Sequence, residues 1–385
     1  MLVLGKRVAI LGSTGSVGQS ALDVIAHLGE PFRAAALSAN RSADKLLEQA
    51  KRFKPSAVAL SDESAHDGCA DALAQLGAKV YVGPGGLVEM VRRDDIDIVL
   101  ADIVGAAGLP AVIAAVQAGK TLALANKEAL VVAGSLVIPE ARRAGVEILP
   151  VDSEHSAIFQ AMKCGRRSDV RRVILTASGG PFRTWSKERI DNATLADALK
   201  HPTWQMGSKI TIDSATMFNK GLELIEACWL FDLEPEQVEI VVHPESIVHS
   251  MVEFVDGSVV AQLSPPDMRT PIQYALTYPE RADGRARRLD LTKAFALNFE
   301  PPDFERFPSL AIAYEVARMK GTSGAVLNAA NEVAVNAFTS GNIAFGSIVK
   351  IVERVVREHR LQLIASLDDL LAADRLARVA AAALA

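Results

Sequence analysis

Three carboxylates at two places in the chain are the residues best suited to chemistry. Asp152 and Glu154 stand two positions apart, and Glu223 follows in a later segment. If residues 150–155 are extended, the first two side chains point the same way. Two carboxylates held so close together are costly unless a cation or a proton neutralises one of them. The three together form an oxygen set that suits Mg²⁺ or Mn²⁺ and leaves positions open for water or substrate. A helix N-cap at Ser153 is the alternative for the first pair.

The segment that carries Glu223 reads HPTWQMGSKITIDSATMFNKGLELIE over residues 201–226. Its β-branched run predicts a short strand at 210–212, followed by a helix from about Ser214. The buried stripe of that helix is expected at Leu222, Ile225 and Trp229. Another face carries an amide, an ammonium and carboxylates, at Asn219, Lys220, Glu223 and Glu226. A solvated face, with a Lys220–Glu223 pair that contributes about a few tenths of a kcal/mol, is the alternative interpretation.

Near the N-terminus, an apolar strand at 8–11 runs into Gly12, Gly15 and Gly18, and a helical pattern follows. A strand, a glycine turn and a helix are the context in which a diphosphate rests on backbone N–H groups. Thr14 stands where the G-x-G-x-x-G fingerprint has its second glycine, so the strict pattern is not met. Close packing of the helix on the strand is the alternative role for these glycines.

The end of the next strand, 33–37, indicates which dinucleotide would bind. The chain continues as Ser38-Ala39-Asn40-Arg41, without the acid that usually holds the ribose 2′-OH of NAD. Asn40 and Arg41 would suit a 2′-phosphate, so the pattern favours NADP. The alternative for Arg41 is a solvated loop cation.

Strands and helices alternate through the first part of the chain. Strands are predicted at 57–60, 79–82, 97–100, 121–125 and 146–149, and helices at 44–53, 87–92, 109–118 and 129–132. This alternation implies a doubly wound, Rossmann-like α/β domain, whose ligands bind at the carboxyl ends of the strands. Asn126-Lys127-Glu128 follows one such strand. On position alone, a binding site and an ordinary helix start are equally good interpretations of this triplet.

The region after residue 150 is predicted to be α+β. Its strands, at 172–175, 238–242, 246–254 and 258–263, have the pattern of an antiparallel sheet. Ser178-Gly179-Gly180 follows the first strand and could hold a small anion, although an ordinary turn is the simpler interpretation. His243 and His249 lie on these strands and are expected to be packed or hydrogen-bonded rather than to be ligands.

The connection 181–209 is long and is a candidate lid over a ligand. It carries Trp185, His201, Trp204 and Met206. Aromatic side chains that simply pack into the core are the alternative.

Chain length and composition set the remaining expectations. The 385 residues predict two or three domains. The patterns above divide the chain into a Rossmann-like dinucleotide-binding domain at 1–149, an α+β domain with the metal set at 150–278, a linker at 279–308 and a C-terminal helical bundle at 309–385. The net charge of −5 gives no general attraction to nucleic acid or anionic membrane. No apolar run is long enough to span a bilayer, and Met1 is followed too soon by a strand to leave room for a signal peptide. Cys69, Cys164 and Cys228 form no ligand cluster, which favours a reducing compartment and a cytoplasmic protein.

Several stretches, in order through all three predicted domains, closely resemble the 1-deoxy-D-xylulose 5-phosphate reductoisomerases, the NADPH enzymes of non-mevalonate isoprenoid biosynthesis. They are LGSTGSVG, ALANKEALV, PVDSEHSAIFQ, SGGPFR, HPTWQMGSKITIDSATMFNKGLELIEA, HPESIVHSMVEF, PDMRTPI and LNAANE. The chain departs mildly from the usual pattern at Ala177, Glu245, Ser264-Pro265 and Ser38-Ala39.

The resemblance implies a role for each site residue. It implies Mn²⁺ or Mg²⁺ on Asp152, Glu154 and Glu223, and catalytic roles for these three with Lys127 and His201. It places NADPH on Thr14, Gly15, Ser16, Val17, Ala39, Asn40, Asn126, Glu128 and Gly207. It places the sugar-phosphate substrate on Lys127, Ser153, Glu154, Ser178, His201, Ser214, Asn219, Lys220 and Glu223, with the phosphate on Ser178, Ser214, Asn219 and Lys220. A homodimer is implied by the family alone.

The implied reaction converts 1-deoxy-D-xylulose 5-phosphate to 2-C-methyl-D-erythritol 4-phosphate in two steps. A metal-assisted retro-aldol cleavage and re-aldol addition gives an aldehyde, and NADPH then reduces it. Two rival functions are weighed against this one. A semialdehyde-dehydrogenase-like reductase would need a nucleophilic cysteine, and a non-catalytic NADP sensor would not need three carboxylates under a lid.

Overall fold

The computed structural model describes residues 6–65, 70–204, 206–364 and 366–385. Cys69, Met1 and, within the predicted lid, Gln205 lie outside this range. The chain forms two compact units, each described here by itself. Unit 1 takes in Met1–Ala129, Val137–Ser156 and Asp267–Arg287, and unit 2 takes in Leu130–Leu136, Ala157–Pro266 and Arg288–Ala385. The compact units reflect packing and do not show where functional domains begin and end. The predicted domain boundaries therefore remain predictions.

Unit 1 is built on a seven-stranded sheet in the order β4-β3-β2-β1-β5-β6-β7, and every neighbouring pair of strands is parallel. The strands are β1 (Lys6–Leu11), β2 (Phe32–Ala39), β3 (Ala57–Leu60), β4 (Lys79–Val82), β5 (Ile98–Ala101), β6 (Thr121–Leu124) and β7 (Ile148–Pro150). This confirms the doubly wound sheet. The strand order reverses between β1 and β5, and ligands of such sheets bind at the carboxyl ends of the strands beside that point.

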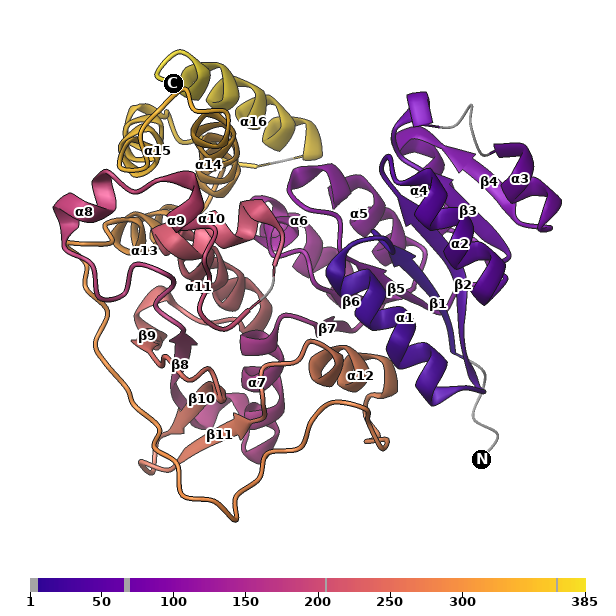
Figure 1. Cartoon of the computed structure of the whole chain (residues 1–385), viewed down its shortest axis with the longest axis horizontal. Helices are drawn as coiled ribbons and strands as arrows, with labels where there is room; N and C mark the ends of the chain where they lie inside the picture. Colours follow the sequence, from indigo (N-terminus) through magenta and orange to yellow (C-terminus); the bar gives the residue numbers. More distant parts are fainter. Residues whose placement is uncertain (1–5, 66–69, 205, 365) are drawn as a thin grey trace. The chain divides into compact units, whose positions relative to one another are not determined.

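Helices follow the strands as the alternation predicts. They are α1 (Ser16–Leu28), α2 (Ala43–Phe53), α3 (Ala70–Gln75), α4 (Gly83–Val91), α5 (Leu109–Gln117) and α6 (Glu128–Ala144). A further helix, α12 (Arg269–Thr277), comes from much later in the chain and packs beside α1, as Figure 1 shows in brown and indigo. No helix was predicted at 269–277. An ion pair between Arg269 and Asp23, 3.1 Å long, joins these two helices.

Unit 2 contains a smaller sheet in the order β11-β10-β8-β9. Its strands are β8 (Val170–Ala177), β9 (Val238–Val242), β10 (Val248–Phe254) and β11 (Val259–Leu263). The hairpin β10–β11 and the pair β10–β8 are antiparallel, but β9 runs parallel to β8. The prediction of an antiparallel sheet was therefore wrong for β9. A helical crossover separates β9 from β8 in the chain and permits parallel pairing.

The other helices up to β9 correct one prediction of local structure. They are α7 (Ser153–Ala161), α8 (Lys187–Asp191), α9 (Leu195–Ala198), α10 (Ser208–Thr216) and α11 (Phe218–Phe231). The strand predicted at 210–212 was wrong, because these residues lie in α10. Thr211 and Ile212 are buried there, and the Thr211 hydroxyl donates to the Gly207 carbonyl, 2.8 Å away. Burial in tertiary packing outweighs the weak β preference of such residues.

The C-terminal part of unit 2 is helical, as predicted. Its helices are α13 (Ser309–Met319), α14 (Ser323–Thr339), α15 (Ser347–Glu358) and α16 (Leu367–Ala382). Helix α14 packs against both α15 and α16 in the yellow region of Figure 1, and α13 packs against α11. The predicted linker 279–308 contains no helix or strand, only an isolated bridge from Glu300 to Val242. No helix in the described part of the chain is both long and apolar enough to cross a membrane.

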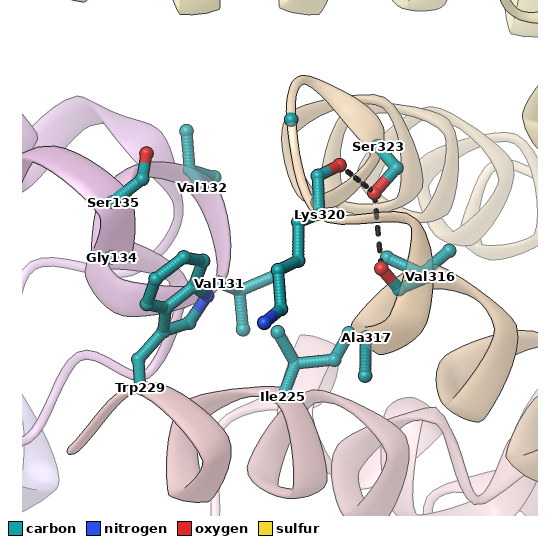
Figure 2. Close-up of a pocket in the computed structure, with 12 residues that line it drawn as sticks. Val131, Val132, Gly134, Ser135, Ile225, Trp229, Val316, Ala317, Lys320 and Ser323 are labelled. Carbon is teal, nitrogen blue, oxygen red and sulfur yellow. Dashed lines mark hydrogen bonds between the residues drawn. The ribbon is translucent and has the colours of Figure 1, made fainter. Parts of the chain in front are cut away.

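A kink in α6 fixes its middle turns against α11 within unit 2. Ala133 departs from helical geometry, with φ −130° and ψ 23°. A Cβ on the neighbouring Gly134 would overlap the Trp229 ring, so only glycine fits at this contact. Figure 2 shows Trp229 beside this turn, in a small pocket that the Lys320 side chain enters from the other side. The Ser323 hydroxyl donates to the carbonyls of Val316 and Lys320, at 3.1 and 2.6 Å, and holds the α13–α14 turn that closes the pocket.

Candidate active site

Unit 1 brings two of the three predicted metal ligands together. Asp152 immediately precedes α7, and Glu154 lies in the first turn of that helix. Each offers a carboxylate oxygen within 4.8 Å of the other. The expectation of an extended segment was wrong, because the helix begins at Ser153 and the Ser156 N–H donates to the Asp152 carbonyl at 2.8 Å. The pair still meets, because both side chains lie at the same helix end.

Lys127 neutralises part of this negative charge. Its Nζ lies 2.8 Å from Asp152 Oδ2, and the two side chains are 6% and 14% exposed. His155 Nδ1 is 3.9 Å from the same oxygen and is fully buried. The Ser153 hydroxyl donates to the Glu154 carboxylate. Lys127 reaches Asp152 only through tertiary structure, whereas His155 lies three positions after Asp152 at the same helix end. The sequence did not indicate a role for His155.

Unit 2 holds the third carboxylate on α11. The Glu223 side chain is 1% exposed, and Lys220, which forms an ion pair with it, is 4% exposed. Asn219 Nδ2 donates to Glu223 Oε1 at 2.5 Å. The solvated-face interpretation is therefore wrong for this helix. A buried carboxylate held by an ammonium and an amide is pre-positioned, since its oxygens cannot rotate away without leaving those donors unpaired.

A second cluster in unit 2 contains three of the predicted substrate residues. Ser178 Oγ lies 3.0 Å from His201 Nε2 and accepts the Gly180 N–H at 3.2 Å. A Cβ at Gly180, where φ is +65°, would lie 2.5 Å from the Ser214 carbonyl oxygen. This contact brings the glycine turn directly against α10. Glycine is therefore required at this position both by the backbone angle and by the close approach.

Backbone contacts of His201 assign its tautomer. Its Nδ1 accepts the N–H groups of Thr203 and Trp204, at 3.2 and 2.9 Å. In the neutral ring the proton therefore sits on Nε2 and is donated to Ser178 Oγ. The Ser178 hydroxyl proton then points away from the histidine and can be donated to a bound anion.

The predicted lid is partly helical and partly packed. Trp185 stacks on the buried Phe182 with ring centroids 4.6 Å apart, so the core alternative is correct for this side chain. Trp204 is half-buried, 6.3 Å from the His249 ring. Gly207 caps the N-terminus of α10 and is exposed. His243 and His249 are buried and hydrogen-bonded to neighbouring residues of unit 2, as expected.

The glycine turn of unit 1 has the geometry of a phosphate-binding loop. Gly12 has φ +87°, and a Cβ there would lie 2.5 Å from the Asp102 carbonyl oxygen. Gly15 caps α1, so the predicted residues Thr14, Ser16 and Val17 lie at the helix N-terminus. The Lys45 Nζ donates to the Thr14 carbonyl at 2.9 Å. This places a cation beside a turn whose backbone N–H groups favour anions.

The segment after β2 contains an ion pair that the sequence did not indicate. Arg41 Nε lies 2.5 Å from Asp62 Oδ2, although the Arg41 side chain is 79% exposed. The hydrogen bonds that Asp62 accepts from Ser64 and then from Arg41 lower its pKa to about 2. The Ser61 hydroxyl donates to Asn40 Oδ1 at 3.1 Å. An acid therefore does stand near this strand end, but it comes from the end of β3.

The Asn126–Glu128 triplet opens α6 at the carboxyl edge of the unit 1 sheet. Asn126 Oδ1 accepts the Ala129 N–H at 2.8 Å, and its Nδ2 donates to the Gly105 carbonyl at 2.9 Å. Asn126 therefore caps the helix, while Lys127 reaches Asp152. The helix-start interpretation is therefore correct for Asn126, and a binding role for the triplet remains a prediction.

Asp102 is the residue that sequence analysis missed most clearly. It follows β5 directly, at the carboxyl end of a central strand, which is the criterion that singled out Asn126–Glu128. Its Oδ2 would lie 3.3 Å from a Cβ at Gly15, so the carboxyl sits against the glycine turn. Burial raises the pKa of Asp102 to about 8, and the negative charge of Glu128 also raises it, while the Gly18 N–H opposes the shift.

Comparisons with known proteins find the same family along nearly the whole chain. Three family models match: 1-deoxy-D-xylulose 5-phosphate reductoisomerase at residues 8–134, its C-terminal domain at 148–231, and the DXP reductoisomerase C-terminal domain at 263–380. The 1-deoxy-D-xylulose 5-phosphate reductoisomerase of Chloroherpeton thalassium is 52% identical over 369 residues, which is 96% of this chain and 95% of that protein.

Solved structures give the same result. The Zymomonas mobilis reductoisomerase in complex with NADPH is 47% identical and superposes with a TM-score of 0.92, covering 98% of both chains. A reductoisomerase in complex with NADPH, fosmidomycin and magnesium is 41% identical, with a TM-score of 0.93 and 98% of both chains covered. This similarity shows that the chain belongs to the 1-deoxy-D-xylulose 5-phosphate reductoisomerase family.

Proposed function

We propose that this protein catalyses the metal-dependent rearrangement and NADPH-dependent reduction of 1-deoxy-D-xylulose 5-phosphate to 2-C-methyl-D-erythritol 4-phosphate. The observation that carries the proposal is 52% identity to a reductoisomerase across 96% of the chain. Relatives of the same family have been solved with NADPH and with magnesium. NADPH and a divalent cation, Mg²⁺ or Mn²⁺, are therefore the cofactors, and the enzyme is an oxidoreductase and isomerase of isoprenoid biosynthesis.

The metal ligands we propose are Asp152, Glu154 and Glu223. All three offer hard carboxylate oxygens, the donor type that Mg²⁺ and Mn²⁺ prefer. Two of them already lie within 4.8 Å of each other, and the third is buried and held by Asn219 and Lys220. When bound, the metal supplies Lewis-acid stabilisation of negative charge on substrate oxygens.

NADPH is proposed to bind along the carboxyl edge of the unit 1 sheet. The turn at Thr14, Gly15, Ser16 and Val17 is proposed to hold the diphosphate, with N–H groups at the N-terminus of α1 as donors. Asn40, with the neighbouring Ala39, stands where the adenosine ribose would lie at the end of β2. Asn126 and Glu128 open α6 at the same edge, and Gly207 is proposed to contribute from the lid.

The substrate phosphate is proposed to bind in unit 2, where Ser178, Ser214, Asn219 and Lys220 provide donors. The Ser178 hydroxyl is oriented toward an anion because His201 Nε2–H occupies its lone pair. Lys127 and Ser153, in unit 1, hold the carboxylates Asp152 and Glu154 in place and are proposed to contact the sugar oxygens. Closure of the lid through Trp204 and Met206 would exclude water, and phosphate binding would supply the energy for that closure.

We also propose that the enzyme is a cytoplasmic homodimer. The support for the dimer is the family resemblance, and the support for the compartment is the small number of cysteines. Light scattering on the purified protein tests the first proposal. The proposed partners are the sugar phosphate and the two cofactors, with no nucleic acid and no membrane.

The deciding experiment is oxidation of NADPH on addition of 1-deoxy-D-xylulose 5-phosphate. We expect absorbance at the NADPH wavelength to fall only when Mg²⁺ or Mn²⁺ is present, and EDTA to stop the reaction. Glucose 6-phosphate serves as the control for a non-specific sugar phosphate. Oxidation that continues in EDTA, or none with either metal, would overturn the proposal.

A further inference from the structure

Asp102 occupies an unusual position for a carboxyl group. It follows β5, which pairs with β1 at the point where the sheet order reverses. Parallel register places Leu11 beside Ala101, so the residues that follow each strand emerge together. Its backbone carbonyl approaches Gly12, and its Oδ2 lies against Gly15. The side chain therefore lies beside the glycine turn and the N-terminus of α1, where the Gly18 N–H hydrogen-bonds to it.

The charges that face Asp102 leave its ionised form poorly compensated. Glu128, at the start of α6, raises its pKa, and the Gly18 N–H of α1 lowers it. Lys45 on α2 is committed to the Thr14 carbonyl on the outer side of the turn. By contrast, Asp152 has Lys127 beside it, 2.8 Å away. A negative carboxylate at Asp102 would also repel a diphosphate within the same turn.

We propose that Asp102 makes dinucleotide binding proton-linked: its carboxyl group is protonated when NADPH is bound and donates its O–H to a diphosphate oxygen. This inference rests on the proposed binding of NADPH at the glycine turn. The proton balance is simple. Below the pKa of Asp102 the proton is already present, and above it each NADPH bound takes up one proton from solvent. Asp102 is thereby a binding residue that the nucleotide contacts through its diphosphate.

Two measurements of NADPH binding test the proposal without turnover. The first is the dissociation constant from NADPH fluorescence between pH 7.5 and 9.5, a range above the titration of the cofactor's own 2′-phosphate. For the unmodified enzyme we expect affinity to fall by about tenfold per pH unit once Asp102 ionises. The second is calorimetry in buffers of different ionisation enthalpy, which we expect to report proton uptake approaching one per NADPH at the upper end.

Asp102→Asn is the decisive variant, because it keeps the shape and a donor but cannot ionise. We expect its affinity to be flat over the same pH range and its proton uptake to vanish, so that it binds NADPH more tightly than the unmodified enzyme at pH 9.5. Asp102→Ala supplies a second neutral variant if the amide misfolds. Glu89→Gln, which removes an exposed charge from α4, is the matched control and should keep the pH dependence. A pH dependence that survives in Asp102→Asn overturns the proposal.

Ser16→Glu separates failure of this inference from failure of the proposed cofactor site. It places a fixed negative charge at the first residue of α1 and should abolish NADPH binding at every pH. If Ser16→Glu binds NADPH normally, the glycine turn is not the cofactor site and both proposals fall. If Ser16→Glu loses binding while Asp102→Asn behaves like the unmodified enzyme, only the role of Asp102 falls.

Discussion

Both units contain a buried lysine–carboxylate pair, but the two pairs form in different ways. Lys220 and Glu223 lie three positions apart on one helix, and their side chains are 4% and 1% exposed. Lys127 and Asp152 come from the starts of two helices and are 6% and 14% exposed. The first pair is local and sealed, whereas the second is assembled by the sheet and is more open. The difference indicates that the Glu223 carboxylate is held rigidly within unit 2, whereas the pair in unit 1 is slightly more exposed to solvent.

Substitution of Glu223 should have the largest effect on activity. Glu223→Gln keeps the hydrogen bond from Asn219 but removes the charge proposed to hold the metal. We expect turnover to fall by on the order of 100-fold or more, since even indirect changes around a metal commonly cost 10–100-fold, while NADPH binding is unchanged. Steady-state assays and NADPH fluorescence measure the two quantities. The matched control is Glu234→Gln, an exposed residue past the end of α11. An equal loss of turnover and NADPH binding would assign Glu223 to the fold.

The two lysines should differ in their effect on stability. Lys220→Met leaves Glu223 buried without its cation, which should lower the free energy of unfolding by about 3–5 kcal/mol. Lys127→Met should cost less, because Asp152 is more accessible to solvent. Urea denaturation with and without Mg²⁺ measures both. Equal losses would show that the greater burial of the unit 2 pair has no energetic consequence. In variants that remain folded, Lys220→Met should also raise KM for the sugar phosphate more than it lowers kcat.

The contribution of Asp102 to the free energy of unfolding should depend on pH in the opposite sense to that of a carboxylate paired with a lysine. The pKa of Asp102 is raised from 3.8 to about 8 on folding, so the unfolded chain gives up this proton first as pH rises. Asp102 therefore stabilises the fold fully at low pH, and that contribution falls between about pH 4 and pH 8, by about 1 kcal/mol per pH unit. Asp102→Asn should flatten this slope. Urea denaturation at pH 5, 7 and 9 measures it, and parallel curves would contradict the assignment.

Cysteine substitution should have the smallest effect. Burial raises the pKa of Cys228 to about 12, and the nearby Glu234 also raises it, so its thiol is a poor nucleophile. Replacement of Cys69, Cys164 and Cys228 by alanine should leave the turnover number within about twofold, because no step requires a thiolate. The same NADPH assay measures it. A large loss of activity in a folded triple variant would favour the rival function, a semialdehyde-dehydrogenase-like reductase.

Local sequence patterns predicted most of the framework of the fold. The strands at 57–60, 79–82 and 238–242 were placed at their observed bounds, because a short apolar run between turn residues leaves little choice of ends. The helical character of the C-terminal region was predicted as well. The patterns failed at 210–212, where β-branched residues are helical, and at β9, whose direction depends on a distant partner. In both cases tertiary packing outweighs the local conformational preference of the residues.

The chain sequence by itself determined the chemical types at the site: three carboxylates, two lysines, a glycine turn and the family to which they belong. It also determined the pairing of Lys220 with Glu223, because helical spacing brings residues three apart together. Only the tertiary structure decided that Lys127 reaches Asp152, that Asp62 pairs with Arg41, and that Asp102 lies against Gly15. These contacts join the ends of different strands, and strand order is set by the packing of the whole sheet rather than by nearby residues.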